Sequence, residues 1–157
     1  FEKAENLRST GHRRFMEIDE MNNKVLAVDP KKCTGCGLCE IACSLSRCGV
    51  SNPSLSRIRI VDLNRPAVFL PLNCRQCEDA PCMAVCPKDA IYRDRDMDRV
   101  MVDYHRCVSC KMCVAACPFG AMGFDDTRRQ VFKCDLCGGE PKCVEFCPMG
   151  ALQLRRV

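Results

Sequence analysis

The stretch Cys107-Val-Ser-Cys110-Lys-Met-Cys113-Val-Ala-Ala-Cys117-Pro118 places four cysteines at gaps of two, two and three residues and ends on proline. Three thiols on so tight a loop can converge on one face of a metal group, and the fourth follows about one helical turn later. This spacing is typical of the ligands of a 4Fe-4S cluster. The stretch therefore predicts an iron-sulfur site built on a loop and a short helix.

The same pattern occurs four times along the chain. Two copies keep the spacing unchanged, while the second and fourth copies lengthen only the middle gap. Proline follows the last cysteine in every copy except the first, where Ser44 stands. Cys48 belongs to no quartet, and we expect it to be a free buried thiol. The quartets are Cys33, Cys36, Cys39 and Cys43; Cys74, Cys77, Cys82 and Cys86; Cys107, Cys110, Cys113 and Cys117; and Cys134, Cys137, Cys143 and Cys147.

The composition indicates that the bound metal supplies folding free energy. Seventeen of the 157 residues are cysteine, there is no Trp, and the hydrophobic share of 47 % includes the cysteines. So thin a carbon core is marginal without a metal. No apolar run is long enough to cross a membrane. The odd cysteine count, the length and the lack of a secretory segment argue against a secreted disulfide scaffold.

Zinc is the main alternative to iron, because sixteen thiolates would also make four zinc sites. Structural zinc sites usually pair two C-x2-C knuckles. They do not need a third cysteine two residues later, a fourth after three more residues, and then a proline. The complete pattern therefore favours iron-sulfur clusters.

The segments between the quartets predict short strands, and so an α+β fold of short strands and short helices. Two hairpins are expected, one before the third quartet and one before the fourth. The predicted strands are residues 25–29, 58–61, 68–70, 90–93, 99–103, 120–124, 130–133 and 151–154.

The gaps between quartets favour two nested modules. Twenty residues separate Cys86 from Cys107, about the gap within a two-cluster ferredoxin, so the second and third quartets form one module. The first and fourth quartets then pair, with the strands at 25–29 and 151–154 side by side. Pairing the first quartet with the second and the third with the fourth remains an alternative. The preferred division is an N-terminal arm at 1–23, an outer bacterial-ferredoxin-like module at 24–66 and 130–157, and an inner one at 67–129.

In two-cluster ferredoxins the fourth cysteine of each run ligates the other cluster. Applied here, this rule gives each cluster three cysteines of one quartet and the last cysteine of the quartet that is paired with it. The predicted sets are Cys33, Cys36, Cys39 and Cys147; Cys134, Cys137, Cys143 and Cys43; Cys74, Cys77, Cys82 and Cys117; and Cys107, Cys110, Cys113 and Cys86.

With these motifs, the chain from about Lys24 onward resembles the four-cluster electron-transfer subunits of molybdenum- or tungsten-pterin oxidoreductases, some hydrogenases and carbon monoxide dehydrogenase. It is similar to the beta subunit of dimethyl sulfoxide reductase, and most similar to the iron-sulfur subunits of tungsten aldehyde oxidoreductases and benzoyl-coenzyme A reductases. The resemblance implies the nested pairing as well. Some relatives lack one cysteine and carry a three-iron cluster; all sixteen positions are filled here, which implies four 4Fe-4S clusters.

The expected function is a relay of single electrons, not catalysis. No nucleophile-base pair, dinucleotide fingerprint or phosphate loop is found. Sixteen thiolates outweigh the charge of four iron-sulfur cores, so the formal charge of +4 becomes negative and nucleic-acid binding is not expected. The resemblance implies a larger catalytic subunit, with tungsten- or molybdenum-pterin, and a second partner such as a flavin subunit or a ferredoxin. A free diffusing polyferredoxin is the alternative.

The first 23 residues lie outside the cysteine motifs. Arg13 and Arg14 are followed by Glu17 and Asp19 where an export signal needs an apolar stretch, so a cytoplasmic location is expected. The scattered apolar residues of this segment suggest an arm that docks on a partner subunit or on another copy of the chain. A disordered tail is the alternative.

Overall fold

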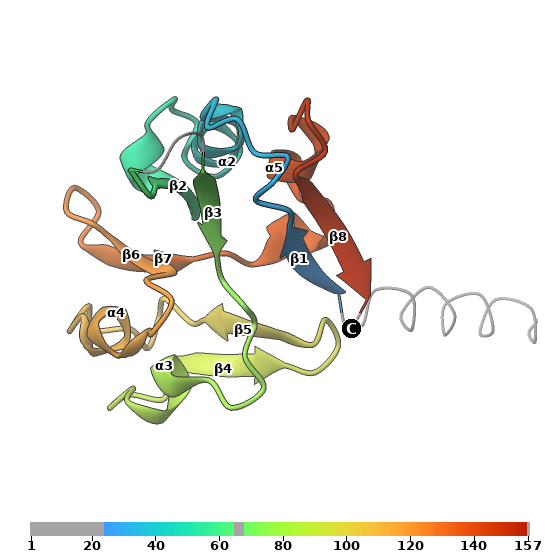
Figure 1. The fold of residues 1–157 in the computed structure, drawn as a ribbon. Helices are drawn as coiled ribbons and strands as arrows, with labels where there is room; N and C mark the ends of the chain where they lie inside the picture. The colour runs from blue at the N-terminus through green and yellow to red at the C-terminus, as the bar shows by residue number, and fades with distance from the viewer. Residues whose placement is uncertain (1–23, 65–67, 157) are drawn as a thin grey trace, which may run out of the picture.

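The computed structural model describes residues 24–64 and 68–156, and the predicted arm at 1–23 lies outside them. Short strands alternate with short helices in this part of the chain, which confirms the α+β class (Figure 1). None of its helices combines the length and the hydropathy needed to cross a membrane. The α-helices are α2 (Leu38–Cys48), α3 (Pro81–Ala84), α4 (Met112–Ala116) and α5 (Lys142–Glu145), and the 3-10 turns are η1 (Pro53–Leu55) and η2 (Leu136–Gly139).

The strands pair as antiparallel ribbons, two strands to a sheet. The first and last strands lie side by side, with Val28 opposite Leu152, which confirms the expected contact between the two ends of the motif region. The predicted hairpins before the third and fourth quartets are also present. The pairs are β1 (Lys24–Val28) with β8 (Leu152–Arg156), β2 (Ile58–Asp62) with β3 (Phe69–Asn73), β4 (Ile91–Asp94) with β5 (Arg99–Val102), and β6 (Met122–Asp125) with β7 (Gln130–Lys133).

The buried side chains form two clusters that include many of the cysteines. In Figure 1, α2 and α5 lie together near β1 and β8, and α3 and α4 lie together near β4 and β5. Core A contains Leu26, Cys39, Cys43, Ile58, Cys134, Leu136, Cys143 and Leu152. Core B contains Ala80, Cys82, Ile91, Val100, Cys113, Met122 and Val131. Cysteines thus replace large apolar residues in both cores.

One helix is much longer than the other helices that carry cysteines. Helix α2 runs for 11 residues and continues past Cys43, while α3, α4 and α5 have 4, 5 and 4 residues. Proline follows the last cysteine of the other three quartets, and the residue before a proline is disfavoured in the helical region. Ser44 takes that place in the first quartet, so α2 continues until Gly49 ends it with a left-handed backbone.

Two hairpins connect the parts of the chain that carry different quartets. The β2–β3 hairpin spans residue 66 and the β6–β7 hairpin spans residue 129, the two expected module boundaries. Both expected boundaries therefore fall within antiparallel ribbons, which join the two parts of the chain. The division into nested modules remains a proposal.

Candidate metal centres

The four cysteine loops share one backbone feature. The residue directly before the second cysteine has a left-handed backbone in each loop: Gly35 at φ 71°, Gln76 at 51°, Ser109 at 57° and Leu136 at 57°. Three of these residues are not glycine, and such a conformation costs roughly 1–2 kcal/mol for a residue with a side chain. A left-handed residue beside a right-handed one turns neighbouring amide groups toward one side, which suits an anion. The backbone feature that the four loops share is therefore compatible with a negatively charged group at each loop.

Gly35 also fits a close approach that the sequence did not predict. A Cβ atom at Gly35 would lie 2.6 Å from the ring of Phe69 on β3. The loop of the first quartet thus packs directly on the β2–β3 ribbon. The backbone angle favours glycine at this position, and the close Phe69 ring distinguishes it from the equivalent positions of the other loops.

Three cavities of similar size each have four cysteines in their lining. In every case three cysteines come from one quartet and one is the last cysteine of another quartet. The linings include Cys74, Cys77, Cys82 and Cys117 in the first cavity, Cys33, Cys36, Cys39 and Cys147 in the second, and Cys86, Cys107, Cys110 and Cys113 in the third.

The remaining cysteines gather where α2 meets α5. Cys43 on α2, Cys143 on α5 and Cys134 belong to core A. The charge of Cys43 contributes to the raised pKa of both Cys134 and Cys143, behind the larger effect of burial. Cys137 follows Cys134 on η2, and its charge also contributes at Cys143. The structure thus brings Cys43 to the fourth quartet, far from it in sequence.

Backbone amides donate hydrogen bonds to the last cysteine of three quartets. The amides of Arg57, Ala90 and Ala121 lie 3.3, 3.3 and 3.4 Å from the Sγ atoms of Cys43, Cys86 and Cys117. Burial opposes the ionisation of Cys86, but hydrogen bonds from Lys88, Ala90 and Ile91 outweigh it and lower its pKa. Such bonds favour the thiolate form that a metal requires.

Burial has the opposite effect on the cysteines of the two cores. It raises the pKa of Cys39 and Cys134 to about 12 and that of Cys113 to about 11. Nearby charges, such as that of Glu40 beside Cys39, raise these pKa values further. A buried anionic thiolate needs compensation, and a bound cationic core supplies it.

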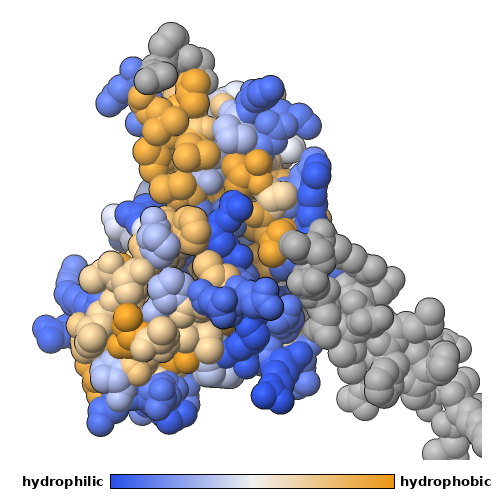
Figure 2. Space-filling view, turned by 60° about the horizontal axis from the view of Figure 1, so that its bottom comes forward, coloured by the Kyte–Doolittle hydropathy of each residue, from blue (hydrophilic) through white to orange (hydrophobic). Residues whose placement is uncertain are grey.

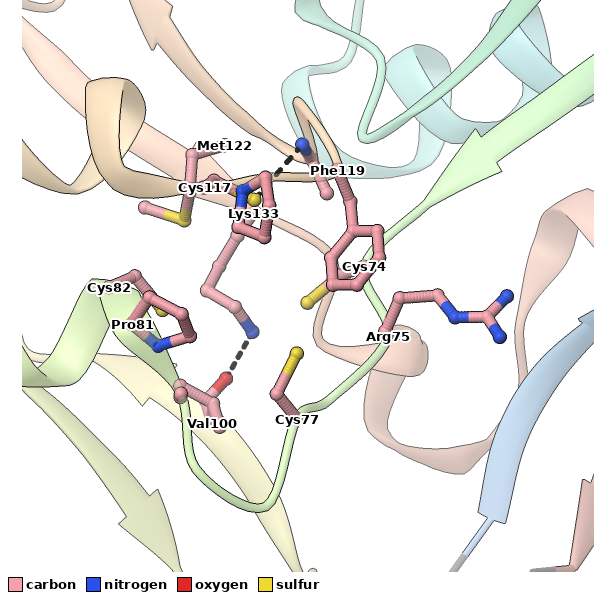
Figure 3. Close-up of a pocket in the computed structure, with 13 residues that line it drawn as sticks. Cys74, Arg75, Cys77, Pro81, Cys82, Val100, Cys117, Phe119, Met122 and Lys133 are labelled. Atoms are coloured by element: carbon pink, nitrogen blue, oxygen red, sulfur yellow. Dashed lines mark hydrogen bonds between the residues drawn. The ribbon is translucent and has the colours of Figure 1, made fainter.

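The donor set fits a cluster better than a single ion. Across residues 24–64 and 68–156, no group of three or more Cys, His, Asp or Glu side chains converges on a point suited to one metal ion. The four thiols instead surround a cavity, as the sticks around Cys74, Cys77 and Cys82 in Figure 3 show. The twelve cysteines that line the three cavities, four to each, suit the all-thiolate ligation of 4Fe-4S clusters.

Three residues outside the quartets bear on the metal centres in different ways. Cys48, the last residue of α2, is only partly buried and lines none of the three cysteine cavities. His105 is exposed. Lys133 carries no motif that would single it out, although it lines the cavity of Cys74, Cys77, Cys82 and Cys117. The only sequence feature that points to a position near a metal centre is that Lys133 directly precedes Cys134.

The family models that match the chain together cover all four cysteine quartets. A 4Fe-4S dicluster domain matches residues 66–157, and a 4Fe-4S binding domain matches residues 26–44. These matches decide between iron-sulfur clusters and zinc in favour of iron-sulfur clusters.

Known proteins are similar over nearly the whole described chain. The polyferredoxin-like subunit of an aliphatic sulfonate oxidoreductase from Pyrococcus furiosus is 41 % identical over 82 % of this chain and 75 % of its own length. The B subunit of the anaerobic dimethyl sulfoxide reductase of Escherichia coli is 35 % identical over 80 % of this chain and 69 % of its own length. The solved active-site complex BamBC of benzoyl-coenzyme A reductase matches with a TM-score of 0.52 and 26 % identity, over 85 % of this chain and 77 % of that one.

Proposed function

Since the chain belongs to the family of 4Fe-4S dicluster proteins and is an iron-sulfur electron-transfer protein, we propose that it carries four 4Fe-4S clusters and relays single electrons. The electrons pass between a catalytic oxidoreductase subunit and a second redox partner. The observation that carries this proposal is the lining of the three similar cavities, each with three cysteines of one quartet and the last cysteine of another.

The proposed ligand sets follow these groupings. Three sets are the cysteines of the three cavities, and the fourth is Cys43 with Cys134, Cys137 and Cys143, supported by their meeting in and beside core A. The sets support two nested modules, residues 24–66 with 130–157 and residues 67–129. Three of the last cysteines, Cys86, Cys117 and Cys147, lie just beyond a short helix, while Cys43 lies within the longer helix α2, so the helices position the cysteines that join the two quartets of each module.

When bound, a cluster with four thiolate ligands supplies one-electron exchange and offers a substrate no open iron position. The chain offers two places where electrons can enter or leave the protein. Cys36 and Cys110 are the exposed cysteines of their cavities. Exposed apolar side chains flank both: Leu38 and Met149 line the cavity of Cys36, and Val108 and Met112 line that of Cys110. We assign these two places to the two partners.

The nature of the partners is part of the proposal. Relatives are named as subunits of an aliphatic sulfonate oxidoreductase and of a dimethyl sulfoxide reductase, and the solved neighbour is part of a benzoyl-coenzyme A reductase complex. By this analogy the catalytic subunit carries tungsten- or molybdenum-pterin, and the second partner is a flavin subunit or a ferredoxin. We propose a cytoplasmic location for the complex. Figure 2 shows hydrophobic side chains gathered in patches with hydrophilic ones between them, as a subunit with docking surfaces presents.

Anaerobic purification of the native complex tests the proposal. We expect about sixteen iron atoms and as many acid-labile sulfides per chain, one-electron signals from four clusters, and a larger metal-pterin protein that copurifies. Far fewer irons after reconstitution would contradict the cluster count. A fully loaded chain that purifies alone at every salt concentration would favour the free polyferredoxin.

A further inference from the structure

Lys133, the last residue of β7, is a buried cation at a cysteine cavity. It is only 4 % exposed, and it lines the cavity of Cys74, Cys77, Cys82 and Cys117. Figure 3 shows its side chain reaching among Cys74, Cys77 and Cys82, with the amine beside the carbonyl oxygen of Val100. It precedes Cys134 in the chain, so one residue adjoins two proposed clusters.

The contacts of the Lys133 amine are dipoles, not charges. Its Nζ donates to the carbonyl oxygens of Val100 and of Cys134, the latter at 2.9 Å, and lies 3.4 Å from Oε1 of Gln76. Gln76 is held in turn, because its Nε2 donates to the Cys134 carbonyl at 2.8 Å and its Oε1 accepts from the Val100 amide at 3.0 Å. Among the ion pairs of the described residues, none includes Lys133.

A buried ammonium without a carboxylate is costly unless another negative charge lies close. The cysteines of the cavity supply that charge as thiolates. The effect is visible at Cys82, where burial raises the pKa and the charge of Lys133 is the largest influence that lowers it. The cation and the sulfur set therefore stabilise each other inside the protein, where screening is weak.

We propose that Lys133, positioned by Gln76, raises the reduction potential of the cluster held by Cys74, Cys77, Cys82 and Cys117. This inference rests on the proposed function. Reduction adds one electron, breaks no bond and needs no proton, so it adds one negative charge near a fixed positive charge. The reduced form gains more from Lys133 than the oxidised form does. Lys133 thus makes this interior cluster a better electron acceptor than its ligands alone would make it.

Lys111 is a matched control within the same molecule. It lines the cavity of Cys86, Cys107, Cys110 and Cys113, next to a ligand in sequence just as Lys133 is. Its side chain, however, is 52 % exposed, lies 3.8 Å from Asp126, and has its Nζ 3.7 Å from the centre of the Phe124 ring. Water and a carboxylate screen this charge. Removing it should change the potential of its cluster little.

The test is a redox titration of the loaded chain, followed by electron paramagnetic resonance, with the variants K133M, K133R, Q76E and K111M. C82S identifies which signal belongs to the cluster beside Lys133. In K133M we expect the reduced-to-oxidised ratio of that cluster at a fixed potential to fall at least tenfold, about 59 mV for one electron. Q76E places a carboxylate beside Lys133 and should shift the same cluster the same way. K133R should stay near wild type, and K111M should shift its cluster less than twofold.

The outcomes separate this inference from the proposed function. A wild-type chain that never holds four clusters overturns the proposed function. Full iron loading in K133M with unchanged potentials overturns the role of Lys133 and leaves the proposed function in place. If K133M does not load, Q76E decides: a lowered potential of the same cluster supports the inference, and an unchanged one refutes it.

Discussion

Cys147 lines the same cavity as Cys36, although the two residues lie near opposite ends of the described chain. The β1–β8 ribbon brings these ends together, and Ala151 and Leu152 line the same cavity. The amide of Asp29 donates to the carbonyl of Ala151 at 2.8 Å just before the first loop begins. The cavity proposed for this cluster therefore depends on both ends of the motif region.

Replacement of Cys147 by serine should remove the cluster that the first quartet holds. We expect iron to fall by about a quarter, or one cluster to convert to a three-iron form, because Cys147 is the only member of its quartet in that cavity. Iron analysis and electron paramagnetic resonance measure this. The control is C48S, which should keep its full iron because Cys48 lines none of the three cysteine cavities.

Replacement of Cys43 should damage a different cluster from the one that its own quartet holds. C43S should reduce the signal of the cluster proposed for Cys134, Cys137 and Cys143, while that of Cys33, Cys36 and Cys39 persists. The reason is the place of Cys43 beside Cys134 and Cys143 in core A. Comparison of the spectra of C43S and C147S checks this. Loss of one and the same cluster in both variants would refute the nested ligand sets.

Gly35 gives a test of how tightly a loop fits its ribbon. G35A combines a left-handed backbone with a Cβ atom 2.6 Å from the Phe69 ring. G138A is the control, since Gly138 has φ 72° and an added Cβ would meet nothing within 4 Å. We expect about 1–2 kcal/mol of destabilisation in G138A and clearly more in G35A. The temperature at which visible absorbance bleaches measures both; equal shifts would show that Phe69 moves aside freely.

The elements of the fold follow from local sequence more closely than their arrangement does. The hairpins could be predicted because apolar stretches flank polar turns, and the helices because a cysteine recurs after three residues. The left-handed residue before each second cysteine could not, because Gln76, Ser109 and Leu136 disfavour that backbone on their own. The surrounding structure imposes it.

The spacing of the cysteines predicts which of them group together, whereas the environment of those groups is harder to predict from sequence. The cysteine groupings in the three cavities correspond to sets expected from spacing. Lys133 and Gln76 carry no motif, and only the packed fold reveals that both are buried and that Lys133 lines a cavity. Burial of a charge is a property of the whole fold and is not written in one segment.

Cluster retention should weaken as the pH falls. Iron binds thiolates, and burial raises the pKa of Cys39 and Cys134 to about 12 and of Cys113 to about 11, so these thiols take up protons when iron leaves. Between pH 8 and pH 6 we expect iron affinity against a fixed chelator to fall about tenfold or more per pH unit. Iron retained after anaerobic dialysis measures it, and retention independent of pH would contradict it.

In the metal-free chain the same raised pKa values make the folding stability fall as the pH rises. Burial favours the neutral thiol, so these cysteines add to folding stability below their ordinary pKa of 9.0. That contribution is lost as the pH rises toward about 12. Circular dichroism of the iron-free chain between pH 8 and pH 12 would follow the loss of any remaining structure.

Ser44 explains the length of α2 and supplies the sharpest test of the helix argument. Its Oγ donates to the carbonyl of Ile41 and accepts from the amide of Asn52, both at 3.1 Å. The turn beyond it carries Arg47, which forms an ion pair with Asp135 between Cys134 and Cys137. S44P restores the proline of the other quartets, but it should cost about 3 kcal/mol because the helix continues here. S44A should cost only about 1 kcal/mol.

The two variants should differ in iron as well as in stability. For a chain of this size the losses correspond to shifts in bleaching temperature of about 10 °C for S44P and about 3 °C for S44A. By breaking α2 after Cys43, S44P also releases Arg47 from Asp135, so the cluster proposed for Cys43 and the fourth quartet should be lost before the others. If S44P instead keeps four clusters and its wild-type bleaching temperature, the part of α2 beyond Cys43 contributes nothing to the site.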